Sequence, residues 1–252
     1  MQDTTIREIP TVSRAKHKRA DRWAKNNEPI QLDAYRKRQR QVVVLPRNVT
    51  QEDYIDLLDN SHNNIVFAIG PAGTGKTMIA VQMAIRALKQ GECERIVVTR
   101  PAVSVDEQHG FLPGTLVDKM APWTRPIFDV FEEYWSPKQI AGMIEDGVIE
   151  IAPLAYMRGR TFKKAWILAD EMQNATPSQM KMLLTRIGEE SKIVVTGDLA
   201  QHDRGYEKNG LKDFVVSLQR FNASRIAKVE FTRSDIERHP AVSEVLEIYG
   251  EG

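Results

Sequence analysis

The feature that most constrains this chain is a glycine-rich octapeptide set between two patterned segments. It reads Gly70-Pro71-Ala72-Gly73-Thr74-Gly75-Lys76-Thr77, which matches the phosphate-loop pattern in full. An apolar run, 65–69, precedes it, and residues 76–89 carry apolar side chains at helical spacing. Glycines let such a loop curl until its N–H groups point inward, and the following helix adds its positive end. A plain glycine-rich turn would not explain a lysine at the mouth of the helix followed by a small hydroxyl residue.

The pattern predicts a phosphate-binding loop and gives its residues separate tasks. Lys76 is expected to reach the β- and γ-phosphates of a nucleotide, and the Thr77 hydroxyl to ligate Mg²⁺. The rest of the loop is expected to bind the phosphates too; these residues are Gly70, Pro71, Ala72, Gly73, Thr74 and Gly75.

Short apolar runs rich in β-branched residues recur along the chain, at 65–69, 95–99, 148–151, 165–169 and 192–196. Such runs are typical of strands buried on both faces of a parallel sheet. Helix-like stretches lie between them, and this alternation predicts an α/β fold with right-handed crossovers. Residues 115–147 interrupt the alternation with aromatic side chains and no clear strand, so we expect a mostly helical insertion there.

Composition excludes several classes of protein. A chain of 252 residues with 42% hydrophobic content can bury a full core. Its one cysteine excludes a disulfide framework and a four-cysteine zinc site, and fits a reducing compartment. No apolar run reaches the roughly 18 residues of a membrane span, and no secretory signal begins the sequence. We therefore expect a cytoplasmic protein without membrane contact, in the host cytoplasm if a phage encodes it.

The formal net charge of +1 hides an asymmetry. Residues 1–41 hold 11 basic and 5 acidic side chains, whereas the remainder holds 24 basic and 29 acidic ones. We predict a mobile basic N-terminal arm over 1–41 and a nucleotide-binding domain over 42–252. The arm either binds a phosphate-rich partner or only keeps the chain soluble, and the sequence leaves both open.

An acidic pair, Asp170 and Glu171, follows directly on the apolar run 165–169. The carboxyl ends of parallel strands form the crevice where α/β sheets bind ligands, so we expect the pair near the phosphate loop. Asp170 is then a candidate Mg²⁺ ligand, and Glu171 a candidate to orient or deprotonate an attacking water. The alternative is a solvated turn at a strand end.

Two further kinds of side chain are candidates for the γ-phosphate. Gln201 stands four residues after Gly197 and either senses this phosphate or satisfies a loop backbone. Arginines can stabilise the charge of phosphoryl transfer, and the sequence does not rank Arg100, Arg158, Arg160, Arg186, Arg233 and Arg238. The basic loop 158–161 could grip a nucleic-acid backbone or a neighbouring subunit, or be solvated surface.

At this point the chain resembles a known family, the PhoH-like ATPases, over about residues 46–249. The matching segments are Thr99–Val103, Gly110–Gly114, Pro153–Thr161, Asp170–Asn174, Leu184–Gly188, Thr196–Asp198 and Arg233–Val242. The phosphate loop is shared by many NTPases, whereas Met157–Thr161 and Arg238–Pro240 are far more specific. Met172, where alanine is more usual, and residues 104–109 depart from the family pattern without touching a phosphate contact.

The resemblance implies a RecA-like core related to superfamily 1 helicases, with ATP and Mg²⁺ as cofactors. It also implies ring-shaped oligomers, expected to be hexamers, and a role on RNA. Gln51 matches the glutamine that recognises adenine, with Tyr54 nearby to stack on the base, and Gln201 matches the helicase glutamine at the γ-phosphate. Arg233 and Arg238 fall where a neighbouring subunit could receive an arginine finger. The arm shows no acidic cluster of the kind found in fused nuclease domains, so we predict no RNase activity.

Three functions are consistent with these sequence features. The leading hypothesis is an oligomeric Mg²⁺-dependent ATPase or helicase acting on RNA or single-stranded nucleic acid. The alternative is a nucleotide-dependent assembly switch that binds a protein partner through 1–41 and moves no strand. A small-molecule kinase is the third, but Glu171 beside Asp170, together with Gln201, favours activation of water.

Overall fold

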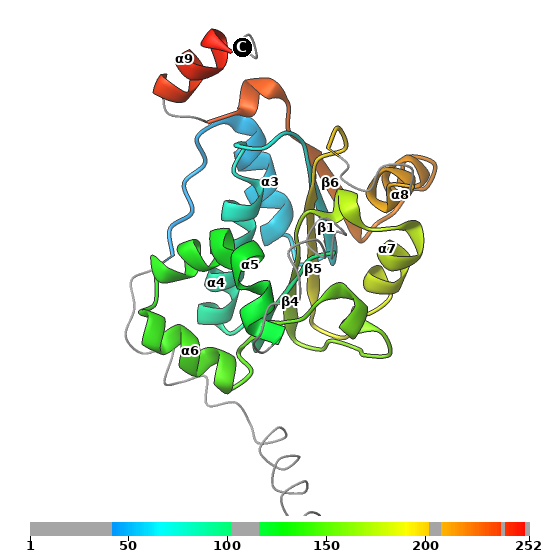
Figure 1. Cartoon of the computed structure of the whole chain (residues 1–252). Coiled ribbons are helices and arrows are strands. Elements are labelled where there is room, and N and C mark those ends of the chain that lie inside the picture. The colour runs from blue at the N-terminus through cyan, green and yellow to red at the C-terminus, as the bar shows by residue number, and fades with distance from the viewer. Residues whose placement is uncertain (1–41, 102–115, 202–207, 238–239, 250–252) are drawn as a thin grey trace, which may run out of the picture. The chain divides into compact units, whose positions relative to one another are not determined.

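The computed structural model describes residues 42–101, 116–201, 208–237 and 240–249 (Figure 1). The chain divides into two units, Met1–Gln31 and Leu32–Gly252, and every described residue belongs to the second. The predicted basic arm 1–41 lies outside the described residues. So do the segment Gly110–Gly114 and the candidate Arg238.

A six-stranded sheet forms the centre of the described part, with the strand order β3-β2-β4-β5-β1-β6. Its strands are β1 (Ile65–Ile69), β2 (Arg95–Thr99), β3 (Ile149–Ile151), β4 (Ala165–Ala169), β5 (Lys192–Gly197) and β6 (Ile226–Glu230). Every strand pair is parallel, so all carboxyl ends meet at one edge. β5 lies between β1, which leads into the phosphate loop, and β4, which leads into Asp170. This is the predicted α/β, RecA-like P-loop NTPase core.

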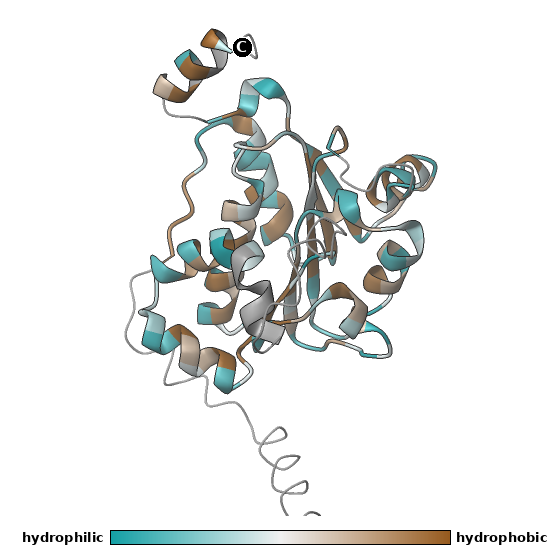
Figure 2. Ribbon diagram, viewed as in Figure 1, coloured by the Kyte–Doolittle hydropathy of each residue, from teal (hydrophilic) through white to brown (hydrophobic). Residues whose placement is uncertain are grey.

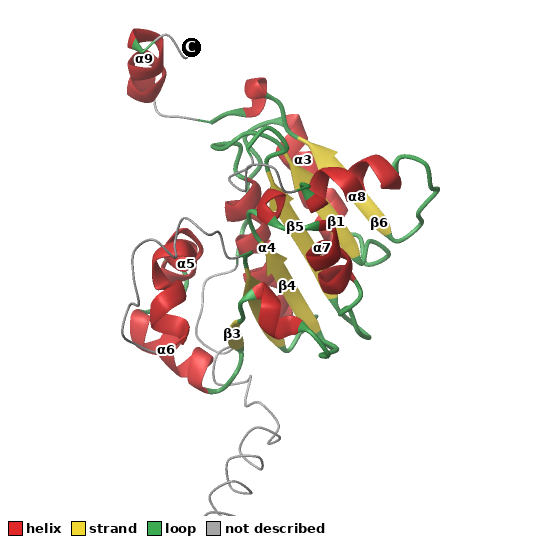
Figure 3. Ribbon diagram, turned by 45° about the vertical axis from the view of Figure 1, so that its right-hand side comes forward, coloured by secondary structure: helices red, strands yellow, loops and turns green. Residues whose placement is uncertain are grey.

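Helices cover both faces of the sheet (Figures 1 and 3). On one side lie α3 (Val49–Asp59) and α4 (Lys76–Gln90), and on the other α7 (Pro177–Leu184) and α8 (Gly210–Leu218). Two helices, α5 (Leu116–Glu132) and α6 (Pro137–Glu145), occupy the expected helical insertion between β2 and β3. The remaining elements are α9 (Pro240–Ile248) and the short 3₁₀ helices η2 (Leu154–Met157), η3 (Met172–Asn174) and η4 (Arg233–Asp235). Within the described ranges, no helix combines the length and apolarity needed to span a bilayer.

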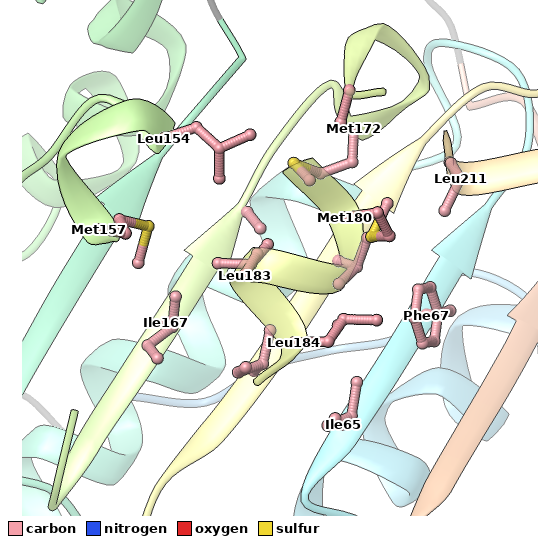
Figure 4. Close-up of a cluster of buried hydrophobic side chains, with 14 of the residues drawn as sticks. Ile65, Phe67, Leu154, Met157, Ile167, Met172, Met180, Leu183, Leu184 and Leu211 are labelled. Atoms are coloured by element: carbon pink, nitrogen blue, oxygen red, sulfur yellow. The ribbon is translucent and has the colours of Figure 1, made fainter. Parts of the chain in front are cut away.

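A buried apolar cluster joins the sheet to α7 and α8 (Figure 4). Leu183 is fully buried among side chains that include Ile167 of β4, and Phe67 of β1 stacks on Phe214 at 5.1 Å between ring centroids. Apolar and hydrophilic residues recur in turn along the helices (Figure 2), and at 3.6 residues per turn such spacing gives a helix one apolar and one hydrophilic face. This packing holds the sheet's carboxyl edge, and the loops on it, in a fixed arrangement.

A mutation in this cluster should cost far more than one at the surface. Leu183→Ala is expected to lower the free energy of unfolding by about 2 to 5 kcal/mol, because it removes buried methyl groups and leaves a cavity. Val216→Ala on the outer face of α8, where the side chain is 44% exposed, is the control and should change it by no more than about 0.5 kcal/mol. Urea denaturation measures both, and equal effects would contradict this account of the core.

Candidate nucleotide site

The phosphate loop connects β1 to α4 through backbone conformations that favour glycine. Gly70, Gly73 and Gly75 have φ values of 147°, 86° and 83°. A Cβ at Gly70 would lie 2.4 Å from the carbonyl oxygen of Phe231, so this position also admits no side chain. Gly75 is the N-cap of α4 and supplies no side-chain cap, so the first N–H groups of this helix have no acceptor within the helix.

A cavity of about 290 Å³ lies beside this loop. Its lining residues come from the loop, from the end of β4 and from the end of β5; they are Ala72, Gly73, Gly75, Lys76, Thr77, Met78, Asp170, Glu171, Thr196, Gly197, Asp198 and Gln201. Five predicted residues therefore line one cavity, as expected from the sequence: Lys76, Thr77, Asp170, Glu171 and Gln201.

Lys76 folds back onto its own loop and is only 9% exposed. Its ammonium nitrogen donates to the carbonyl oxygen of Pro71 at 2.6 Å and to Oγ1 of Thr74 at 3.2 Å. Burial lowers the pKa of Lys76, while the charges of Asp198, Glu171 and Asp170 oppose that shift. A buried cation held by neutral oxygens gains from an anionic partner, and phosphate oxygens supply one.

Asp170 joins three segments through one carboxylate oxygen. Its Oδ1 accepts from Oγ1 of Thr77, at the start of α4, at 2.8 Å, and from Oγ1 of Thr196 in β5. Its backbone N–H donates to the carbonyl oxygen of Thr99 in β2. A carboxylate beside a hydroxyl offers the hard oxygen ligands that Mg²⁺ prefers, so Thr77 and Asp170 fit this ion. Sequence reasoning missed Thr196, although it ends a predicted strand directly before Gly197.

Glu171 is held by a glutamine that sequence reasoning gave no role. Gln173 is 1% exposed, and its Nε2 donates to the carboxylate of Glu171. Its Oε1 accepts from the backbone N–H of Asp198 at 3.1 Å. A Cβ at Gly197 would lie 2.8 Å from that Oε1, so the glycine permits the close approach. Gln173 thus ties the end of β4 to the loop after β5. Its polar side chain, two residues after Glu171, is the sequence feature from which a role in the site could have been predicted.

Glu171 itself has a left-handed backbone, with φ 53°. Such a conformation is uncommon for a residue with a side chain and persists where the surroundings fix it. Here it turns the chain sharply between β4 and η3, which sends the Glu171 side chain to the cavity wall.

The assignment of Gln51 to adenine stays a prediction, whereas the place of Tyr54 differs from what the resemblance implied. Gln51 is 1% exposed; its Nε2 donates to the carbonyl oxygen of Thr74 at 3.2 Å, and its Oε1 accepts from the N–H of Arg47 at 2.9 Å. Both ends of the Gln51 amide are therefore hydrogen-bonded to backbone groups, and one of these groups belongs to the phosphate loop. The expected stacking of Tyr54 on a base is wrong, because this side chain is fully buried with its ring edge-on to Phe231. The apolar spacing of α3 turns Tyr54 into the core.

The candidate arginines separate into two groups. Arg100, Arg160 and Arg186 hold parts of the fold together: Arg100 donates to the carbonyl oxygen of Trp123, Arg160 pairs with Glu150, and Arg186 donates to the carbonyl oxygens of Met182 and Arg160. Arg158 and Arg233 are exposed, and neither side chain has a polar partner among the described residues. Four residues after Arg233, the N–H of Glu237 donates to the carbonyl oxygen of Gly73 in the same chain's loop.

Comparison with known proteins shows the family of this chain. The family model described as "PhoH-like protein" matches residues 43–250. A PhoH-like protein of Synechocystis sp. is 42% identical over 224 residues, which are 88% of this chain and 67% of that protein. One from Mycobacterium tuberculosis is 46% identical over 88% of this chain and 62% of its own length. Protein PhoH of Escherichia coli K12 is 41% identical over 82% and 58%.

The chain thus spans 58 to 67% of the length of these relatives. Among solved structures, Bacteroides Pif1 bound to ssDNA is similar at 16% identity and a TM-score of 0.35, over 81% of this chain and 46% of Pif1. The family match covers the strands, the phosphate loop and the acidic pair together. The chain accordingly belongs to the PhoH-like protein family and carries the nucleotide site of a P-loop NTPase.

Proposed function

We propose that this protein is a Mg²⁺-dependent ATPase that works as an oligomer on RNA or single-stranded nucleic acid. The observation that carries the ATPase part is the convergence of Lys76, the Thr77–Asp170 pair and Glu171 on one cavity. Lys76 and the free N–H groups of the loop suit a triphosphate, and Thr77 with Asp170 suits its metal ion. Glu171 adds a base beside them, which a site for binding alone does not need.

In the proposed reaction, the triphosphate enters the loop and Lys76 exchanges the carbonyl of Pro71 for phosphate oxygens. Bound Mg²⁺, held by Thr77 and Asp170, would neutralise charge on the phosphates. Glu171 accepts a proton from water as that water attacks the γ-phosphorus, and the bond to the β-phosphate oxygen breaks to give ADP and phosphate. Gln201 contacts the γ-phosphate from the loop after β5, and Gln173 holds the Glu171 carboxylate in position.

The oligomeric and nucleic-acid parts rest on the family resemblance. In a ring of six chains, Arg233 or Arg238 of one chain would reach the γ-phosphate of the next and stabilise its developing charge. The exposure of Arg233 supports such a role. Its position near its own loop, through the bond from Glu237 to Gly73, equally allows contact with its own nucleotide.

The roles of Glu171 and Lys76 are tested by two substitutions. Glu171→Gln keeps the size of the side chain but cannot accept a proton, so turnover should fall at least about 100-fold while ATP binding is retained. Lys76→Ala should weaken ATP binding itself. Phosphate release and isothermal calorimetry measure the two quantities separately. Normal turnover in Glu171→Gln would show that another group directs the water.

A second pair of substitutions tests whether Gln173 positions Glu171. Gln173→Ala removes the bonds to Glu171 and to Asp198, and Gln173→Glu retains an oxygen for the N–H of Asp198 but sets a second carboxylate against Glu171. Both should lower kcat about 10-fold or more and leave KM for ATP nearly unchanged, because Gln173 does not line the cavity. Gln219→Ala, at an exposed position after α8, is the control. A rise in KM with normal kcat would contradict the positioning role.

The nucleic-acid part of the proposal is tested by measuring phosphate release with and without oligouridine. The oligomeric part is tested by measuring the solution mass with and without ATP. We expect RNA to raise turnover and the mass to reach six times that of one chain. Nucleotide-dependent assembly with no effect of RNA on turnover would favour the assembly switch instead. A single chain at every concentration would end the ring proposal.

A further inference from the structure

We propose that Tyr156 and Arg158 form a contact surface for single-stranded nucleic acid, in which Tyr156 stacks on a base and Arg158 binds a phosphate. This inference rests on the proposed function, because it names where on this chain the strand binds. The two residues follow β3 on η2 and the loop after it. β3 ends at the carboxyl edge of the sheet, which also carries the nucleotide cavity, and η2 begins three residues after that strand.

The support beneath Tyr156 is rigid. Leu154 and Met157 are 2% and 0% exposed, and both side chains point into the core (Figure 4). The same turn leaves Tyr156 65% exposed, with its backbone N–H bonded to the carbonyl oxygen of Pro153 at 2.8 Å. An aromatic ring held outward on an anchored turn loses little conformational entropy when a base stacks on it.

The structure distinguishes the two arginines of this loop. The guanidinium of Arg160 bonds both carboxylate oxygens of Glu150, one at 2.9 Å, and lies 4.4 Å from the centre of the Phe162 ring. Contact with a ligand would require these interactions to break. Arg158 is exposed and has no polar partner among the described residues, so its charge is free to bind an anion.

The chemistry of the loop favours a strand of nucleic acid over a protein partner. Arg160 already neutralises Glu150, whereas Arg158, two residues after the exposed Tyr156, has no carboxylate paired with it among the described residues. Gly159 between the two arginines has φ 77°, and a Cβ there would meet nothing within 4 Å, so a bulky backbone can approach. Proteins that bind single strands combine cations, which bind the phosphates, with exposed aromatic rings, on which the bases stack, and this turn offers one side chain of each kind.

This surface also lies on a path from the nucleotide site. η2 packs against α7, and α7 begins three residues after η3, the turn that contains Gln173. A change at Glu171 and Gln173 on hydrolysis would therefore reach η2 through one helix. Such a connection gives the ATPase a means of altering its grip on the strand.

The test is fluorescence anisotropy of labelled oligouridine, titrated with the full chain. Tyr156→Ala should weaken binding about 10-fold and Tyr156→Phe should restore it, because the ring is retained. Arg158→Ala should weaken binding about 5-fold and reduce the slope of log K against log salt by about 1. Phe221→Ala and Arg220→Ala are the matched controls, an exposed aromatic and an exposed arginine after α8, and should bind as the unaltered protein does.

The outcomes separate this inference from the function on which it rests. If the unaltered protein binds no oligouridine, the nucleic-acid part of the proposed function fails and this surface fails with it. If it binds and the Tyr156 and Arg158 variants bind equally well, only the surface is wrong. If the variants change the solution mass and leave RNA affinity unaltered, the surface joins copies of the chain, which also overturns the inference.

Discussion

A single carboxylate oxygen, Oδ1 of Asp170, connects the elements on which the site depends. It accepts hydrogen bonds from the hydroxyl groups of Thr77, in the first turn of α4, and of Thr196 in β5. The backbone N–H of Asp170 donates a further hydrogen bond to β2. The phosphate loop, the acidic pair and the loop after β5 can therefore not shift independently. Because Asp170 is 9% exposed, its charge gains from these donors more than it would in water. The same oxygen atoms that fasten the strands together are those that a metal ion would require.

Much of the fold follows from the sequence because the four central strands, β1, β2, β4 and β5, are almost wholly buried and read as continuous apolar runs. β6 was missed since it is an edge strand in which only Val229 is buried, so its residues, Ile226–Glu230, show no such run. In the site, the phosphate loop and the acidic pair were predictable because a fixed local spacing encodes them. The roles of Gln173 and Thr196 and the burial of Tyr54 could not be predicted from local spacing, because they depend on contacts between segments that are distant in the sequence.

Lys76 and Gln51 also support the phosphate loop from within. Both side chains that family patterns direct at the ligand are bonded to backbone oxygens of the loop, those of Pro71 and Thr74. These bonds hold the loop in shape and satisfy groups that would otherwise be buried without partners. Arg158 and Arg160 likewise differ although they belong to one motif. Arg160 pairs with Glu150 and holds the fold, whereas Arg158 faces solvent.

The segment after β6 closes over the phosphate loop, through the contact of Phe231 with Gly70 and the bond from Glu237 to Gly73. Every motif residue from the loop to Gln201 precedes this segment in the chain. A shortened chain that ended after β5 would keep all the signature letters of an NTPase yet lack the brace that shapes its cradle. Scanning genomes for the signatures alone would therefore not distinguish such fragments from chains that carry this brace.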